Sequence, residues 1–141
     1  VSRQLNRAFI GNSVPFFQPL LSATIHINGK EVLVEWTRSA QQMLKERTQP
    51  LVMELELYFS CLIKKFVQFH DGLDNNDTVR ISDNFHIRFR TLTSTACSID
   101  ELPKGQRQPP TELDTPIAKR LAPKRIRVDY RNQQWQGEYW L

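Results

Sequence analysis

The clearest pattern in the chain is a pair of alternating apolar and polar runs that meet at Asn28-Gly29. Asn-Gly is the preferred turn of a two-residue β-hairpin, because both positions adopt positive φ readily. This turn pairs Ile27 with Lys30 and fixes the register of a hairpin at residues 21–36. The side chains that share its apolar face are Leu21, Ala23, Ile25, Ile27, Val32, Val34 and Trp36. The sequence therefore predicts a hairpin with one buried face and one solvated face.

A second hairpin is predicted at residues 125–140, with Asn132-Gln133 as its turn. The apolar pairs are Tyr130 with Trp135, Val128 with Gly137 and Ile126 with Tyr139, and the polar pairs are Arg127 with Glu138 and Arg125 with Trp140. The two polar pairs predict an ion pair and a cation–π contact. Asn-Gln is a weaker turn sequence than Asn-Gly, so a three-residue loop is the alternative.

Residues 51–70 fit either a strand or a helix. Apolar and polar side chains alternate in the first half of this run, as they do in a strand. A helix also collects most of the apolar side chains on one face, but Met53 and Leu57 then point away from that face and Glu56 enters it. These three misfits favour the strand.

The remaining elements are read from turn chemistry and helix caps. Residues 71–77 have the composition of a turn, and strands are predicted at 78–82 and 85–95, forming a third hairpin. The run Arg38–Arg47 favours a short helix, with Thr37 or Ser39 as its N-cap and Pro50 after its end.

Residues 98–123 contain five of the eight prolines and predict an irregular connection, interrupted by a helical turn at 116–121 that Thr115 caps. The whole chain, 1–141, is predicted to be a single domain. The fold class is α+β: a mainly antiparallel sheet built from the hairpins 21–36, 78–95 and 125–140, with one or two helices packed on one face.

The composition of the 141 residues is ordinary for a globular protein, with 40% hydrophobic and 24% charged side chains. No apolar run approaches the roughly 18 residues of a membrane span, so no membrane association is expected. The two cysteines, without a secretory signal in the chain, predict reduced thiols and a cytoplasmic protein. The net charge of +4 mildly favours anionic partners.

Arginines project from one side of each of two predicted strands, with neighbouring side chains about 7 Å apart, which is close to the spacing of phosphates in a nucleic-acid strand. The candidate anion-binding or partner-binding residues are Arg88, Arg90, Lys119, Arg120, Lys124, Arg125, Arg127 and Arg131. Asp129 and Glu138 interrupt this basic stripe, and the neighbouring aromatic side chains face inward. A protein partner or a small anionic ligand is therefore favoured over nucleic acid.

The alternative site is a metal or redox centre formed by Cys61, Cys97, His70 and His86. The spacing of these residues matches no ligand pattern with close pairs of the C-x-x-C type. Free cysteine is among the most buried residue types, so two separate core thiols are favoured, and no cofactor is expected.

No nucleophile elbow, phosphate loop or zinc-protease motif is present, and no catalytic residue is assigned. The sequence favours a small non-enzymatic binding module that uses a basic sheet face and its proline-rich loop. The alternative is a small enzyme or metal/redox protein centred on the cysteines and histidines. A monomer and a homodimer formed by edge-strand pairing or by the apolar N-terminal arm both stay open.

Overall fold

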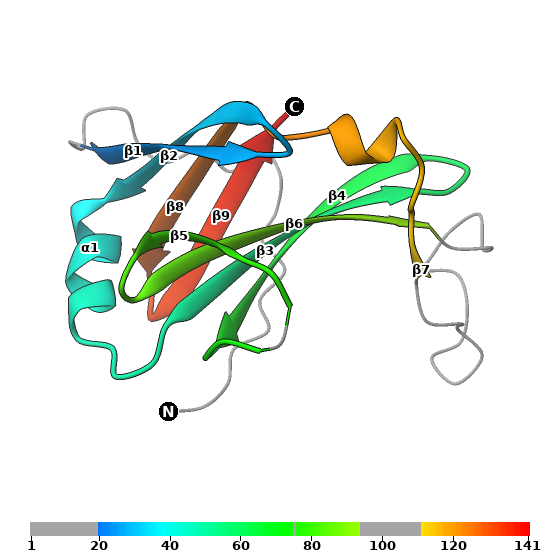
Figure 1. The fold of residues 1–141 in the computed structure, drawn as a ribbon. Helices are drawn as coiled ribbons and strands as arrows, with labels where there is room; N and C mark the ends of the chain where they lie inside the picture. The colour runs from blue at the N-terminus through cyan, green and yellow to red at the C-terminus, as the bar shows by residue number, and fades with distance from the viewer. Residues whose placement is uncertain (1–19, 75, 94–110) are drawn as a thin grey trace, which may run out of the picture.

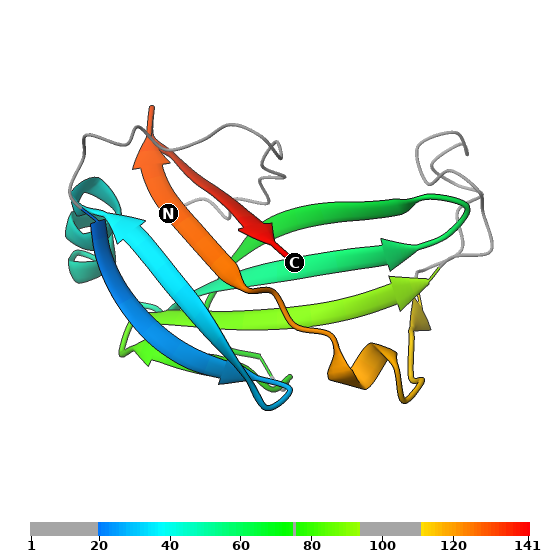
Figure 2. The same ribbon diagram turned by 90° about the horizontal axis from the view of Figure 1, so that it is seen from above.

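The computed structural model describes residues 20–74, 76–93 and 111–141. Its strands form two sheets that pack face to face around one hydrophobic core (Figures 1 and 2). One α-helix lies at an end of this β-sandwich. The described part of the chain contains no helix with the length and apolar character that a membrane crossing needs.

Sheet A contains both of the best-specified hairpins. Its strands, in spatial order, are β1 (Leu20–Ile27), β2 (Lys30–Thr37), β8 (Arg125–Arg131) and β9 (Gln134–Trp140). Both predicted registers are confirmed, because Ile27 pairs with Lys30 and Tyr130 pairs with Trp135. The two central residues of each turn have positive φ, as this class of hairpin turn requires.

Sheet B contains the segment that was ambiguous in the sequence. Its strands, in spatial order, are β4 (Ile63–Asp71), β3 (Leu51–Phe59), β6 (Phe85–Thr93) and β5 (Val79–Ser82), and β7 (Thr111–Glu112) pairs with the end of β6. The strand interpretation of residues 51–70 is confirmed, although the run turns back at 60–62 and forms two strands. The β5–β6 hairpin is confirmed within the predicted range 78–95.

The prediction of a mainly antiparallel sheet is only partly correct, because both sheets are mixed. Each sheet joins two antiparallel hairpins through one parallel pair, β2 with β8 in sheet A and β3 with β6 in sheet B. Turn chemistry specifies strands that are neighbours in sequence, whereas a parallel pair joins strands that are distant in sequence. The class remains a sheet-rich α+β fold.

The predicted apolar faces of both hairpins in sheet A form half of the core. Three pairs of aromatic rings, each with centroids 6.1 Å apart, cross from sheet A to sheet B: Trp36 with Phe85, Trp135 with Phe69, and Tyr139 with Phe89. The hydroxyl of Tyr139 also donates a 2.6 Å hydrogen bond to the backbone oxygen of Glu56 in β3. The sheets approach each other closely at Gly137, where a Cβ atom would meet Met53 and Phe69 of sheet B.

The helix α1 (Arg38–Lys45) begins where the sequence predicted, with Thr37 as its N-cap. The Thr37 hydroxyl accepts a 3.2 Å hydrogen bond from the backbone N–H of Ala40 and donates a 2.6 Å hydrogen bond to Asp129 of β8. Ala40 and Leu44 enter the core. Contrary to the prediction, α1 lies at the end of the sandwich rather than across a sheet face, as Figure 1 shows.

The predicted helical turn at 116–121 is present as the 3₁₀-helix η3 (Ala118–Arg120). The hydroxyl of Thr115 accepts a 3.1 Å hydrogen bond from the backbone N–H of Ala118, as the predicted cap requires. The first half of the proline-rich connection, residues 98–110, lies outside the described residues.

Candidate functional site

The arginines predicted to bind an anion lie on opposite sides of the molecule. Arg88 and Arg90 alternate along β6 with core residues, so they project from the outer face of sheet B. By the same alternation, Arg125 and Arg127 project from the outer face of sheet A. The structure therefore does not bring these residues together into one basic surface. The two groups of arginines lie on separate sheets, which the sequence did not reveal.

On sheet A, the three arginines of β8 form hydrogen bonds with carboxylates. Glu35 accepts hydrogen bonds from Arg125 at 2.6 Å and from Arg127 at 3.3 Å. Burial alone would raise the pKa of Glu35, but the two guanidinium groups outweigh burial and lower it. Asp129 accepts a 2.6 Å hydrogen bond from Arg131. These arginines are therefore engaged within the protein.

Two further predictions concern the same region. The cation–π contact is confirmed, because the guanidinium of Arg125 lies 5.5 Å from the centre of the Trp140 ring. Lys119 pairs with Asp114 at 2.8 Å, although both side chains are exposed. Arg120 and Lys124 are exposed residues of the connection before β8. An exposed ion pair of this kind contributes little to stability.

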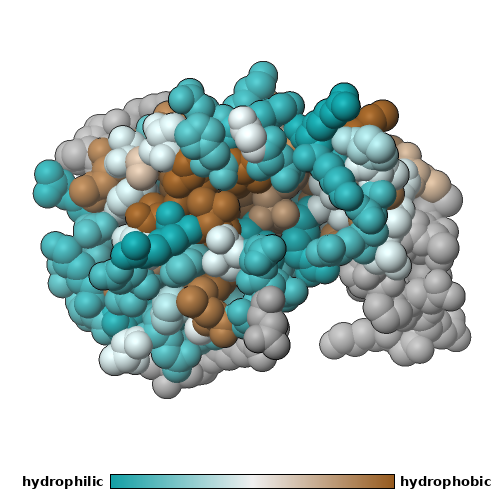
Figure 3. Space-filling view, in the orientation of Figure 1, coloured by the Kyte–Doolittle hydropathy of each residue, from teal (hydrophilic) through white to brown (hydrophobic). Residues whose placement is uncertain are grey.

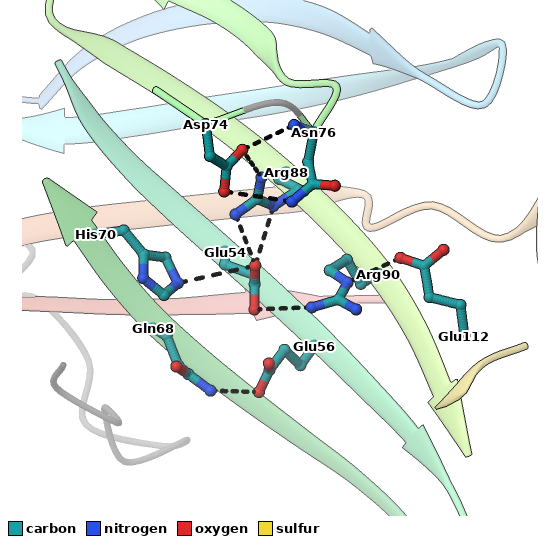
Figure 4. Close-up of polar contacts among 9 residues, drawn as sticks. All are labelled: Glu54, Glu56, Gln68, His70, Asp74, Asn76, Arg88, Arg90 and Glu112. Carbon is teal, nitrogen blue, oxygen red and sulfur yellow. Dashed lines mark hydrogen bonds and ion pairs between the residues drawn. The ribbon is translucent and has the colours of Figure 1, made fainter. Parts of the chain in front are cut away.

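On sheet B, the arginines converge on Glu54, a residue that no sequence pattern singled out (Figure 4). Arg88 donates a 3.0 Å hydrogen bond to Glu54, and Arg90 lies 3.6 Å from its second oxygen. Arg88 also contacts Asp74 at 2.7 Å, and Arg90 contacts Glu112 at 2.9 Å. We call these five residues the Glu54 cluster. Pairing of β3 with β6, which sequence patterns do not show, aligns Glu54 with Arg88.

The electrostatics of the Glu54 cluster keep Glu54 and Asp74 ionised. Burial raises the pKa of Glu54, but contacts with His70 and Glu56 and the charges of Arg88 and Arg90 outweigh burial and bring it to about 2. The hydrogen bond from Arg88 lowers the pKa of Asp74. Glu54 is thus a permanent anion near neutral pH and does not supply a proton as a general acid. The Glu54 cluster, with three carboxylates and two guanidinium groups, is an internal ion network rather than an open binding site.

Of the predicted metal or redox set, His70, His86 and Cys61 are not brought together. His70 and His86 both align with Val52, on its two sides, so their strands place them about 10 Å apart. Cys61 lies in the turn between β3 and β4, at the far end of those strands. Among the residues that the structure describes, no group of three or more histidines, cysteines and acids could hold a metal ion. The fourth predicted ligand, Cys97, lies outside the described residues.

The two histidines have different surroundings. His86 shares a 3.1 Å hydrogen bond with the hydroxyl of Thr78, and burial together with the charge of Arg80 lowers its pKa. The Nε2 atom of His70 lies 3.8 Å from Glu54 and is buried without a hydrogen-bond partner among the described residues. In the described structure, the side chain beside His86 is thus the Thr78 hydroxyl, and the side chain beside His70 is the Glu54 carboxylate.

The prediction of a buried, reduced thiol is wrong for Cys61. This residue is exposed and disulfide-bonded. A hairpin turn places its side chains in solvent, and no turn was predicted at this position. Disulfides persist in oxidising compartments, so the thiol argument for a cytoplasmic location no longer holds.

One side of the sandwich, between β1 and β5, exposes apolar side chains. Figure 3 shows these side chains gathered between the two edge strands, which run nearly across the view. Ala23 of β1 and Val79 and Ile81 of β5 are only partly buried against the core, and Leu21 is 39% exposed. We call this region the β1–β5 seam. It is a gap in the lateral covering of the core.

Within the described part of the chain, the edge of β1 above the seam lacks the usual protection of an edge strand. Natural edges are blunted by charged side chains, bulges or short length. Of the other three edges in the described sheets, β4 carries Lys64 and Lys65, β9 carries Glu138, and β5 is four residues long with a bulge after Arg80. By contrast, β1 is eight residues long, pairs with β2 without a bulge, and contains no lysine, arginine or acid.

A separate cleft of about 430 Å³ lies beside the end of α1, lined by Met43, Glu46, Arg47, Thr48, Gln49 and Asp71. Within this lining, the guanidinium of Arg47 lies 2.5 Å from the carboxylate of Asp71. This pair links the loop after α1 to the end of β4, which is a structural role.

Comparisons with known protein families, with curated proteins and with solved structures find no match for this chain. Its function is therefore argued from the geometry above.

Proposed function

We propose that this protein is a non-enzymatic interaction module that accepts an extended polypeptide strand at the edge of β1. This keeps the binding-module interpretation of the sequence but moves the binding surface. The arginine-bearing faces are neutralised by Glu35, Asp129 and the Glu54 cluster, so the basic face no longer supports anion binding. The disulfide at Cys61 supports placing the module in an oxidising compartment.

The observation that carries the proposal is the free edge of β1 above an apolar seam. A two-residue turn closes on a hydrogen-bonded pair, so the odd-numbered residues of β1 bond to β2. Ser22, Thr24 and His26 then direct their backbone N–H and C=O groups outward, and all three residues are exposed. No described strand pairs with β1 on this side. An added strand would gain backbone hydrogen bonds from the edge and cover the seam with alternate side chains.

The test uses a blocked synthetic peptide with the sequence of β1, extended by two lysines for solubility. Amide hydrogen exchange of the chain, followed by NMR, is measured with and without the peptide. We expect the amides of Ser22, Thr24 and His26 to exchange rapidly in dilute protein and to become protected by the peptide. The amides of Ile25 and Ile27, already bonded to β2, are expected to be protected in both states and serve as the internal reference.

A variant and a control sharpen this test. Thr24→Pro removes one outward N–H without removing a bond to β2, and we expect it to weaken peptide binding by about tenfold. Leu33 lies beside Thr24 on β2, so Leu33→Lys alters the same face one strand inward and is expected to bind normally. Absence of protection at about 1 mM peptide, a concentration chosen to detect weak binding, would overturn the proposal.

A further inference from the structure

We infer that the strand received at this edge is β1 of a second copy of this chain, paired antiparallel about a two-fold axis at Thr24. The inference deepens the proposed function and rests on it. A two-fold dimer of this kind joins the two copies of sheet A into one continuous sheet.

The outward backbone groups of β1 are complementary to the same groups of a second copy. With the axis at Thr24, Thr24 faces its own copy and Ser22 faces the partner's His26. Ser22, Thr24 and His26 then form hydrogen-bonded pairs, with six backbone hydrogen bonds expected for the ladder. An axis at Ala23 instead pairs Ser22 with Thr24 and Leu20 with His26, so the backbone groups fit both registers. The side chains favour the axis at Thr24.

The side chains of β1 match those of a second copy in this register. Residues that face each other in an antiparallel pair lie on the same side of the sheet. The register therefore sets Leu21 against the partner's Ile27, and Ala23 against the partner's Ile25, on the seam side. This covers Leu21, which is 39% exposed in the single chain. On the outer face, threonine meets threonine, a favourable cross-strand pair.

The absence of charged side chains on β1 also favours pairing with a second copy. Lysines, arginines and acids on an edge strand oppose pairing with an identical strand, because like charges face each other. The strand β1 contains none of these residues. It therefore offers no charge by which to select a charged peptide, whereas it pairs with itself without repulsion. A single strand pair is smaller than an obligate interface, so the dimer is expected to be weak, with a dissociation constant in the micromolar range or higher.

Sedimentation equilibrium of the full, unreduced chain tests the inference. The expected mass rises from 16.5 kDa toward twice that value as the concentration increases. Thr24→Lys places two lysines opposite each other and is expected to raise the dimer dissociation constant by about tenfold or more. Leu33→Lys has the same charge change and lies in the same row of the sheet, but on the inner strand β2, and is expected to dimerise as the wild type does.

A cross-link provides a readout that does not depend on the stability of the lysine variant. In the inferred register, Thr24→Cys sets two cysteines about 5.5 Å apart between Cα atoms, within the range of a disulfide. Mild oxidation is expected to give a covalent dimer with Thr24→Cys and none with Leu33→Cys. The native Cys61 is already disulfide-bonded and does not compete.

The outcomes separate the inference from the proposed function. A chain that stays monomeric at about 1 mM but protects its edge amides with the peptide overturns the dimer and retains strand acceptance. A dimer that resists Thr24→Lys and does not cross-link at Thr24→Cys overturns the β1 interface. Loss of both peptide binding and dimerisation overturns the inference and the proposed function together.

Discussion

Gly137 lies where the two sheets approach closely, and its replacement by alanine tests the packing of the sandwich. A Cβ atom at this position would clash with the terminal methyl group of Met53 and lie 3.1 Å from the ring of Phe69. The side chains of Met53 and Phe69 are 0% and 1% exposed, so they have little room to move. Overpacking a filled core costs about 1–3 kcal/mol, and we expect Gly137→Ala to lower the free energy of unfolding by this amount.

The assay is urea unfolding followed by tryptophan fluorescence, with a double-mutant cycle as the control. Met53→Ala alone is expected to cost about 2–5 kcal/mol because it leaves a cavity. When it is combined with Gly137→Ala, that cost is expected to be smaller by at least about 1 kcal/mol, since the new methyl group occupies the cavity. Costs that add to within about 0.5 kcal/mol, or a Gly137→Ala variant as stable as the wild type, would refute the described contact between the sheets.

Three further predictions concern polar contacts and the disulfide. The pKa of Glu54 is about 2 in the folded chain, below its ordinary 4.5, so ionised Glu54 contributes its full stabilisation above pH 4.5 and loses it as the pH falls toward 2. The urea midpoint of the Glu54→Gln variant should therefore fall less steeply over that pH interval than the midpoint of the wild type. Thr37→Val removes the helix cap and the hydrogen bond to Asp129, and calorimetry should show a loss of about 1–3 kcal/mol, whereas an unchanged melting curve would contradict both roles. The unreduced, denatured chain should show no reactive thiol at Cys61, and reduction should lower stability by about 2–4 kcal/mol; a titratable thiol before reduction would contradict the disulfide.

The parts of the fold that the sequence predicted are those fixed by local rules. Asn28-Gly29 and the alternation around it determined one register, and Asn132-Gln133 determined the other. Thr37 identified the start of the helix for the same reason, because capping depends on a few neighbouring residues. In residues 51–70, Glu56 correctly favoured a strand, but no strong turn residue marked the reversal at 60–62.

The candidate site could not be predicted because it depends on contacts between distant strands. Arg88 and Arg125 looked like free cations in the sequence, since their partners Glu54 and Glu35 lie 34 and 90 residues away. Only the two parallel pairings bring these groups together. The uncharged composition of β1 was visible in the sequence, but its position at an edge follows from the strand order.

The distribution of charge over the two sheets explains why recognition is assigned to an edge rather than to a face. An external anion that replaced Glu54 at Arg88 would displace a buried carboxylate whose pKa of about 2 shows how strongly its surroundings favour the charged form. Displacement would leave that carboxylate buried without its partner, a cost of about 3–5 kcal/mol that the anion would have to offset. A strand that binds along β1 displaces no partner among the described residues, because Thr24 and its outward-facing neighbours direct their backbone polar groups away from β2. Binding at the edge therefore exchanges hydrogen bonds to water for hydrogen bonds to a strand and removes the β1–β5 seam from water at the same time.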